Sequence, residues 1–241
     1  PTNPNILYAG TGEQNNRNST SWGNGVYRSD DGGDSWSYLG LVGTRHVGKI
    51  VVHPTDPDIA WVAGLGNLWA PNEQRGVFRT MDGGRSWEKV LYVDEFTGGV
   101  DLEIDSSNPD VLYAAMYQRE RKAWGFNGGG PGSGIYKTID GGANWNELGG
   151  GLPAGDKGRI GIAISDSDPN ILMALVEAPN RPEPGAAGRG RGGRGGGRYG
   201  ILALGLEQPA ARLVREIGVD AGFAPPVERA FQAFERRDIA R

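Results

Sequence analysis

The chain contains no cysteine and only two histidines, His46 and His53, among its 241 residues. The lack of cysteine excludes disulfides, thiolate metal sites and cysteine nucleophiles. Two histidines argue against a multi-histidine metal centre, so we expect no metal and no cofactor. No apolar run approaches the roughly 18 residues that a membrane helix needs. No signal peptide is visible, but the chain opens at Pro1 rather than Met, so loss of a leader and export of a longer parent protein stay open.

Glycine and the aromatic residues are the abundant components. There are 42 glycines, more than twice the usual share of about 7%. Seven tryptophans, eight tyrosines and six phenylalanines accompany them. This composition is typical of a core built from aromatic residues and short strands, with glycine at the turns. It indicates neither a helical bundle nor a wholly disordered chain.

Two phrases recur along the sequence. One has the form Ser/Thr-x-Asp-x-Gly-x-x-Trp and occupies residues 29–36, 80–87 and 138–145. The other places a proline between two Asn or Asp residues ahead of a hydrophobic run, and its prolines are Pro4, Pro57, Pro109 and Pro169. A period of about 50 to 60 residues that holds several short strands is the size of one four-stranded propeller blade. The repeats therefore predict an all-β chain of propeller blades.

The first phrase resembles the Asp-box, or BNR, repeat of sialidase-like propellers. The fuller pattern, from Asn3 to about Glu177, looks like bacterial proteins related to the sortilin N-terminal domain, which are often named glycosyl hydrolases. The resemblance implies a β-propeller fold. It is not specific for function, because Asp-boxes are structural elements in enzymes and in non-enzymes alike.

The chemistry of the Asp-box explains its structural role. Its glycines permit a turn with positive φ, and its carboxylate accepts hydrogen bonds from N–H groups of that turn, helped by the Ser or Thr hydroxyl. We expect the tryptophan to fold back as a buried plug. The box residues are Ser29, Asp31, Gly33, Trp36, Thr80, Asp82, Gly84, Trp87, Thr138, Asp140, Gly142 and Trp145.

We letter the strands of each blade A to D from the propeller axis outward. The sequence predicts three strands in the first blade, four in each of the next two and two at the end, which makes an incomplete ring of about three Asp-box blades. Propellers have at least four blades, and an open segment leaves unpaired strand edges that can self-associate. Because strands alternate in direction, the A–B turns and the Asp-boxes share one face. The B–C and D–A loops share the other.

The B–C loops are long, at 10–24, 64–75 and 116–133, and each contains one tryptophan. Long loops on a rigid scaffold are where binding sites usually lie. Aromatic rings flanked by charged groups can stack on sugars or hold a peptide. The alternative is that each tryptophan only seals its loop against a neighbouring blade. The candidate ligand-binding residues on this face are Trp22, Trp69, Trp124, Arg45, His46 and Arg121.

Catalysis is the second alternative. Glycoside hydrolysis needs two carboxylates about 5–9.5 Å apart across a cleft. The carboxylates available on the loop face or on strand A are Glu13, Asp94, Glu95 and Asp101, of which Glu13 and Asp101 are the catalytic candidates. No motif pairs them, so whether the chain is an enzyme stays open. We interpret it as a segment that binds a peptide, protein or glycan on the B–C/D–A loop face. The alternatives are part of a sialidase-like or xyloglucanase-like glycoside hydrolase, and a structural assembly scaffold.

The composition changes after the propeller segment, which we assign to residues 1–180. Residues 181–200 are a Gly/Arg-rich tract that reads as a flexible B–C insertion. The net charge of −4 argues against binding to nucleic acid. Residues 201–241 form a non-repeat tail, predicted to be helical. In it, 201–204 could supply a strand, 207–217 reads as a helix, and a second helical pattern follows Pro226.

Overall fold

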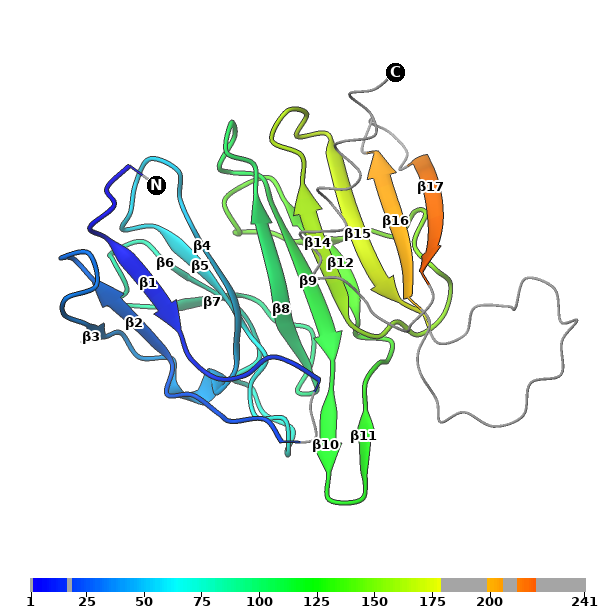
Figure 1. Cartoon of the computed structure of the whole chain (residues 1–241), viewed down its shortest axis with the longest axis horizontal. Helices are drawn as coiled ribbons and strands as arrows, with labels where there is room; N and C mark the ends of the chain where they lie inside the picture. Colours follow the sequence, from blue (N-terminus) through cyan, green and yellow to red (C-terminus); the bar gives the residue numbers. More distant parts are fainter. Residues whose placement is uncertain (1, 17–18, 179–198, 206–211, 220–241) are drawn as a thin grey trace, which may run out of the picture.

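The computed structural model describes residues 2–16, 19–178, 199–205 and 212–219, the last two ranges as backbone alone. These residues form four small antiparallel sheets that lie side by side, together with a two-stranded hairpin (Figure 1). The described part of the chain is all-β except for one turn of 3-10 helix, η1 (Val42–Thr44). The arrangement is that of a partial β-propeller in which each sheet is one blade.

Each sheet follows the chain from strand to strand. The first contains β1 (Leu7–Gly10), β2 (Val26–Ser29) and β3 (Ser37–Tyr38). The second contains β4 (Val47–Val52), β5 (Ala60–Gly64), β6 (Gly76–Thr80) and β7 (Glu88–Leu91). The third contains β8 (Thr97–Ile104), β9 (Leu112–Gln118), β12 (Gly134–Thr138) and β13 (Asn146–Glu147). The fourth contains β14 (Ile160–Ile164), β15 (Ile171–Glu177), β16 (Tyr199–Gly205) and β17 (Arg212–Val219).

The fourth sheet corrects the sequence analysis. The expected two strands are four, because β16 pairs with β15 over seven residue pairs and β17 pairs with β16. The helix predicted over 207–217 is wrong for residues 212–217, which belong to β17. A ladder with β16 gives these backbone groups partners that outweigh a local helical preference. The Gly/Arg tract at 181–198 and the second predicted helix lie outside the described residues.

The hydrophobic core lies between successive sheets. Trp61 and Val77 of the second sheet pack with Leu102, Leu112 and Met116 of the third. A smaller cluster joins the first sheet to the second, and a larger one joins the third to the fourth. Each sheet therefore depends on its neighbour for burial, as expected for stacked repeats.

The Asp-box corners are closed by local hydrogen bonds. In the second sheet, the Thr80 hydroxyl donates to Asp82 Oδ1 at 2.8 Å and accepts from Gly84 N–H at 2.8 Å. Ser86 donates to both Asp82 oxygens, from its N–H at 2.9 Å and its hydroxyl at 2.6 Å. The same bonds recur in the first box, and in the third Asn144 donates from its N–H and its side-chain amide in place of Ser86. Each box aspartate is therefore engaged by its own turn.

The Asp-boxes also bind the proline phrases. The N–H of the first box glycine donates to the carbonyl of the residue after the proline, as from Gly83 to Asp58 and from Gly141 to Asp110, both at 2.9 Å. The first sheet repeats this bond between Gly32 and Asn5 at 2.9 Å. The two recurring phrases thus lie at the same end of each sheet. We call this end the Asp-box face.

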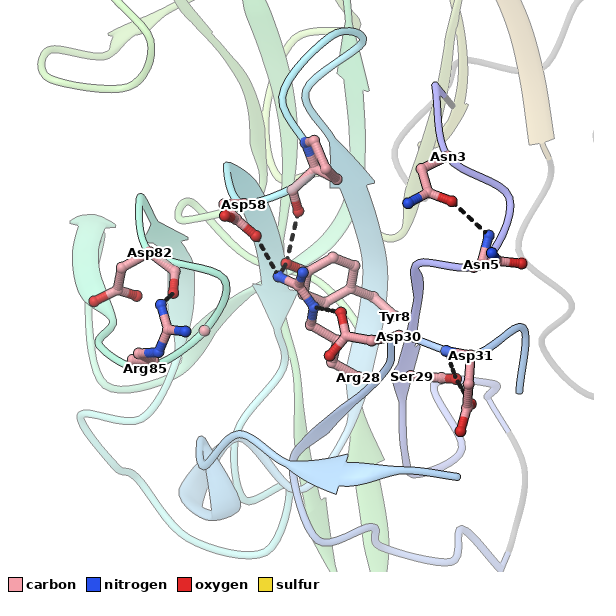
Figure 2. A network of polar contacts seen from close by, with 12 residues as sticks. Asn3, Asn5, Tyr8, Arg28, Ser29, Asp30, Asp31, Asp58, Asp82 and Arg85 are labelled. Carbon is pink, nitrogen blue, oxygen red and sulfur yellow. Dashed lines mark hydrogen bonds and ion pairs between the residues drawn. The ribbon is translucent and has the colours of Figure 1, made fainter. Parts of the chain in front are cut away.

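Side chains on the Asp-box face connect one sheet to the next (Figure 2). Arg28 of β2 donates to Asp58 Oδ1 of the second sheet at 2.6 Å and to the Tyr8 hydroxyl at 2.9 Å. The Tyr8 hydroxyl in turn donates to the Pro57 carbonyl at 2.8 Å. Between the second and third sheets, Arg79 and Trp61 both donate to the Gly141 carbonyl, at 2.9 and 3.1 Å.

The expectation that box tryptophans are buried plugs is wrong for Trp36, which is 44% exposed, and holds only in part for Trp87 and Trp145, which are half-buried. Each stands just before the outermost strand of its sheet, and Trp87 and Trp145 pack against the clusters between sheets. Trp87 also donates to the Leu39 carbonyl at 2.8 Å. The fully buried tryptophan is Trp61, on the second strand of its sheet.

Candidate ligand-binding face

The opposite end of the sheets carries the B–C loops (11–25, 65–75 and 119–133) and the D–A loops (39–46, 92–96 and 148–159). We call it the loop face. The third B–C loop contains the hairpin of β10 (Glu120–Lys122) and β11 (Gly125–Asn127), which extends beyond the sheets at the lower edge of Figure 1. The loop face is therefore the more elaborate end of the molecule.

Arginines hold the loops of different sheets together. Arg119, which is fully buried, donates to the Gln14 and Asn15 carbonyls of the first B–C loop, both at 3.1 Å. Arg159 donates to the Gln14 carbonyl at 3.0 Å and to its side-chain oxygen at 2.9 Å. The backbone N–H of Arg121 donates to the Leu68 carbonyl at 2.7 Å and joins the second loop to the third. These bonds connect the first B–C loop with the third and fourth sheets.

The three loop tryptophans project outward. Trp22 is 63% exposed, Trp69 is 47% exposed, and Trp124, between β10 and β11, is 86% exposed. Phe126 is also exposed, and the guanidinium groups of Arg119 and Arg121 lie 5.5 and 5.4 Å from its ring centre. Each of these rings keeps a large part of its surface open to solvent.

Trp22 and Arg45 line a hollow of about 570 Å³ on the loop face. The Arg45 guanidinium carbon lies 4.8 Å from the Trp22 ring centre, a cation–π contact. Within the described part of the chain, this guanidinium has no hydrogen bond or ion pair. The residues that line the hollow are Thr11, Trp22, Gly23, Asn24, Val42 and Arg45.

His46 lies beneath this surface. It is 1% exposed, and its Nδ1 has no hydrogen-bond partner among the described residues. Burial lowers the pKa of His46 to about 4, although a hydrogen bond with the Glu13 backbone acts to raise it. The charges of Arg119, Arg45 and Arg75 lower it further. The imidazole is therefore neutral at pH 7. Of the two neighbouring candidates, Arg45 lines the hollow and His46 does not.

The carboxylate candidates occupy different surroundings. Glu13 Oε2 accepts the Ser21 N–H at 2.9 Å within its own loop. Asp101, on the inner strand β8, accepts the Ile162 N–H of β14 at 2.9 Å, and Lys49 Nζ lies 3.6 Å away. Burial raises the pKa of Asp101, although the Ile162 N–H and Lys49 both act to lower it.

A second hollow, of about 320 Å³, lies beside Asp101 along the inner strands. It is lined by Gln14, Gly48, Lys49, Val100, Asp101, Arg159, Ile160, Gly161 and Leu175. The arrangement brings a carboxyl of raised pKa together with the cations Lys49 and Arg159. Sequence reasoning did not assign Lys49, Gln14 or Arg159 to a site, because no motif marks them and only the stacking of the sheets brings them together.

The structure offers little toward other kinds of site. In the ranges it describes, no three His, Cys, Asp or Glu side chains gather as metal ligands. No helix there has both the length and the apolar character to cross a membrane.

Comparison with solved structures identifies the fold. The chain is similar to an ancestral GH74 enzyme, with a TM-score of 0.54 and 18% identity over 91% of this chain. The matched part spans 26% of that enzyme, about a quarter of its length. A second similar structure, YCF48 bound to D1 peptide, has a TM-score of 0.38 and 14% identity, over 82% of this chain and 64% of that one. No protein family and no curated protein matches the sequence. The first likeness shows that the chain is a β-propeller segment.

Proposed function

We propose that the chain is a ligand-binding propeller segment of the Asp-box type, related to bacterial proteins resembling the sortilin N-terminal domain. Its loop face binds a peptide, protein or glycan. The observation that carries this proposal is the exposure of Trp22, Trp69 and Trp124, one from each of three successive B–C loops. Exposed aromatic side chains gathered on one face of a protein mark interaction sites more often than isolated ones do.

The scaffold beneath these rings supports the proposal. Arg119 and Arg159 tie the first B–C loop to later sheets through four hydrogen bonds. Loops held in this way lose little conformational entropy on binding, which favours affinity. Large rings on preorganised loops are suited to stacking against a ligand.

The experiment is a screen of glycan and peptide arrays with the full chain. Any ligand found is then titrated against Trp22→Ala, Trp69→Ala and Trp124→Ala. We expect at least one variant to weaken binding by about tenfold or more. Trp36→Ala is the matched control, since Trp36 is an exposed ring on the Asp-box face. Equal weakening by the control, or no ligand on either array, contradicts the proposal.

A second function, glycoside hydrolysis, is favoured by the surroundings of Asp101. Its raised pKa suits a general acid, and it lines a hollow with Lys49 and Arg159. The chain corresponds to only part of the GH74 structure that it resembles, so the remainder of such a site would come from elsewhere. Release of sugar from a polysaccharide panel, abolished in Asp101→Asn or Glu13→Gln, would establish this function. Binding without release favours the first function, and silence in both assays favours an assembly scaffold.

We also propose self-association through the first sheet. In the other three sheets an inner strand pairs with the second strand, whereas β1 has no such partner among the described residues. Leu7 is 37% exposed, whereas Leu112, at the same position of the third sheet, is fully buried by its neighbour. An unpaired edge beside an uncovered apolar surface promotes association.

A further inference from the structure

We infer that the hollow between Trp22 and Arg45 binds an acidic sugar, a hexuronate unit of a polysaccharide. The inference rests on the proposed function and assigns a ligand class to one part of the loop face. The carboxylate pairs with the Arg45 guanidinium, and the sugar ring lies against the exposed indole of Trp22 and the side chain of Val42. Asn24 meets the sugar hydroxyls.

The backbone around Arg45 is fixed before any ligand arrives. Arg45 follows η1 and has a φ of 50°, which few residues with a side chain adopt. Its carbonyl accepts a hydrogen bond from Gly23, and its N–H donates to Val42 at 3.3 Å. A Cβ on Gly12 would collide with the Arg45 carbonyl, so glycine alone permits this close approach. The loop therefore holds Arg45 beside Trp22 by contacts that do not involve the guanidinium.

The guanidinium is available to an anion. It lies on the indole of Trp22, and within the described ranges no carboxylate pairs with it. Stacking leaves the N–H groups at the edge of the guanidinium plane, and these form two parallel bonds with a carboxylate. Arg45 is the one charged residue among the described residues that line the hollow. Glu13, the acidic residue of the first B–C loop, accepts the Ser21 N–H instead.

The lining favours a sugar over a peptide. Extended peptides are recognised largely through hydrogen bonds to free backbone groups. Here several lining backbone groups are already paired, since Thr11 N–H donates to Gly25, the Thr11 carbonyl accepts from Val47, and Asn24 N–H donates to the Thr11 hydroxyl. The lining side chains include an indole, an aliphatic group, the Asn24 amide, whose Nδ2 donates to the Tyr27 hydroxyl at 3.4 Å, and one cation. The volume of about 570 Å³ lies within the usual range of about 300–1,000 Å³ for small-ligand sites.

The test is calorimetric titration of the full chain with hexasaccharides of galacturonate, glucuronate and mannuronate. Each has a matched probe in which the carboxylates are reduced to alcohols. We expect at least one acidic hexasaccharide to bind, and its reduced counterpart to bind about 10- to 100-fold more weakly, as for loss of a charged hydrogen-bonded pair. Arg45→Gln should remove this preference, and Trp22→Ala should weaken binding of both forms.

Two controls and a competing ligand complete the experiment. Arg85→Gln and Trp36→Ala change a similar cation and ring on the Asp-box face, and both should bind as the unchanged chain does. Thermal melting checks that each variant is folded. Equal binding of acid and alcohol forms, an unaffected Arg45→Gln, or tighter binding of hexaglutamate than of any uronate would each overturn the inference. If no hexauronate binds while other array ligands still bind through Trp69 or Trp124, the inference fails and the proposed function stands. If nothing binds, both fail.

Discussion

Removal of Trp61 should destabilise the fold more than removal of any Asp-box tryptophan. Trp61 is 2% exposed, packs between the second and third sheets, and donates to the Gly141 carbonyl across that interface. Truncation of a fully buried tryptophan to alanine costs about 3–5 kcal/mol. For a domain of this size, each kcal/mol lowers the Tm by about 2–4 °C, so Trp61→Ala should lower it by about 6–20 °C. Differential scanning calorimetry and urea unfolding measure the two quantities.

Two further variants grade the loss of packing. Trp61→Phe keeps one aromatic ring but loses the N–H donor and part of the indole volume, while the Gly141 carbonyl still accepts from Arg79 at 2.9 Å. It should therefore cost less than Trp61→Ala, about 1–3 kcal/mol. Trp36→Ala removes a half-exposed ring whose N–H bonds within its own turn, at Gly33, so its cost should stay near 1 kcal/mol. A Tm loss for Trp36→Ala as large as that for Trp61→Ala would refute the assignment of the core to the sheet interfaces.

The remaining predictions concern pH, a second pair of sheets and association. Hydrogen bonds from Ser86 and Thr80 lower the pKa of Asp82 to about 2. The stability that these bonds supply is therefore complete above about pH 4 and is lost as the pH falls toward 2. Asp82→Asn should reduce the fall in Tm over this acidic range. The depressed pKa of His46, about 4 against 6.5 unfolded, makes stability fall between pH 6.5 and 4, and His46→Gln should reduce that slope. A double-mutant cycle on Arg28→Gln and Asp58→Asn, by urea unfolding, should give a coupling of about 0.5–1 kcal/mol, and a value of zero would remove this pair as a link between sheets. Sedimentation should show self-association of the chain that Leu7→Glu reduces, whereas a stable monomer contradicts association through the first sheet.

The features predicted well from the sequence are those that local interactions create. The Asp-box closes through bonds between residues two and four apart, such as Thr80 with Asp82 and with Gly84, so its pattern is legible in a short window. The strands beside it follow from the same spacing, and so does the separation of the Asp-box face from the loop face. The sequence does not predict strand β17, because its pairing with β16 is a contact that a local helical pattern does not reveal.

The features that escaped prediction depend on contacts between sheets. Trp61 and the box tryptophans are equally aromatic in sequence, yet only Trp61 is enclosed, because the third sheet covers it. Arg119 reaches the Gln14 and Asn15 carbonyls, which lie 105 and 104 residues earlier in the chain, and no motif records such a partner. The loop tryptophans could be named from sequence, but their exposure could not, since a loop tryptophan can equally be packed away.

The two faces of the propeller use their polar groups differently, and this bears on how binding can change without loss of the fold. On the Asp-box face each box aspartate accepts hydrogen bonds from its own turn, so a substitution there alters stability first. On the loop face the arginines that hold the loops donate to backbone carbonyls, as Arg119 does to Gln14. Every residue has a backbone carbonyl, so these hydrogen bonds persist when the exposed aromatic and charged side chains of the loops are substituted. Trp22, Trp69, Trp124 and Arg45 can then vary with the ligand while Arg119 preserves the geometry. Substitution of Arg119 should accordingly disturb binding and stability together, whereas substitution of Arg45 should disturb binding alone.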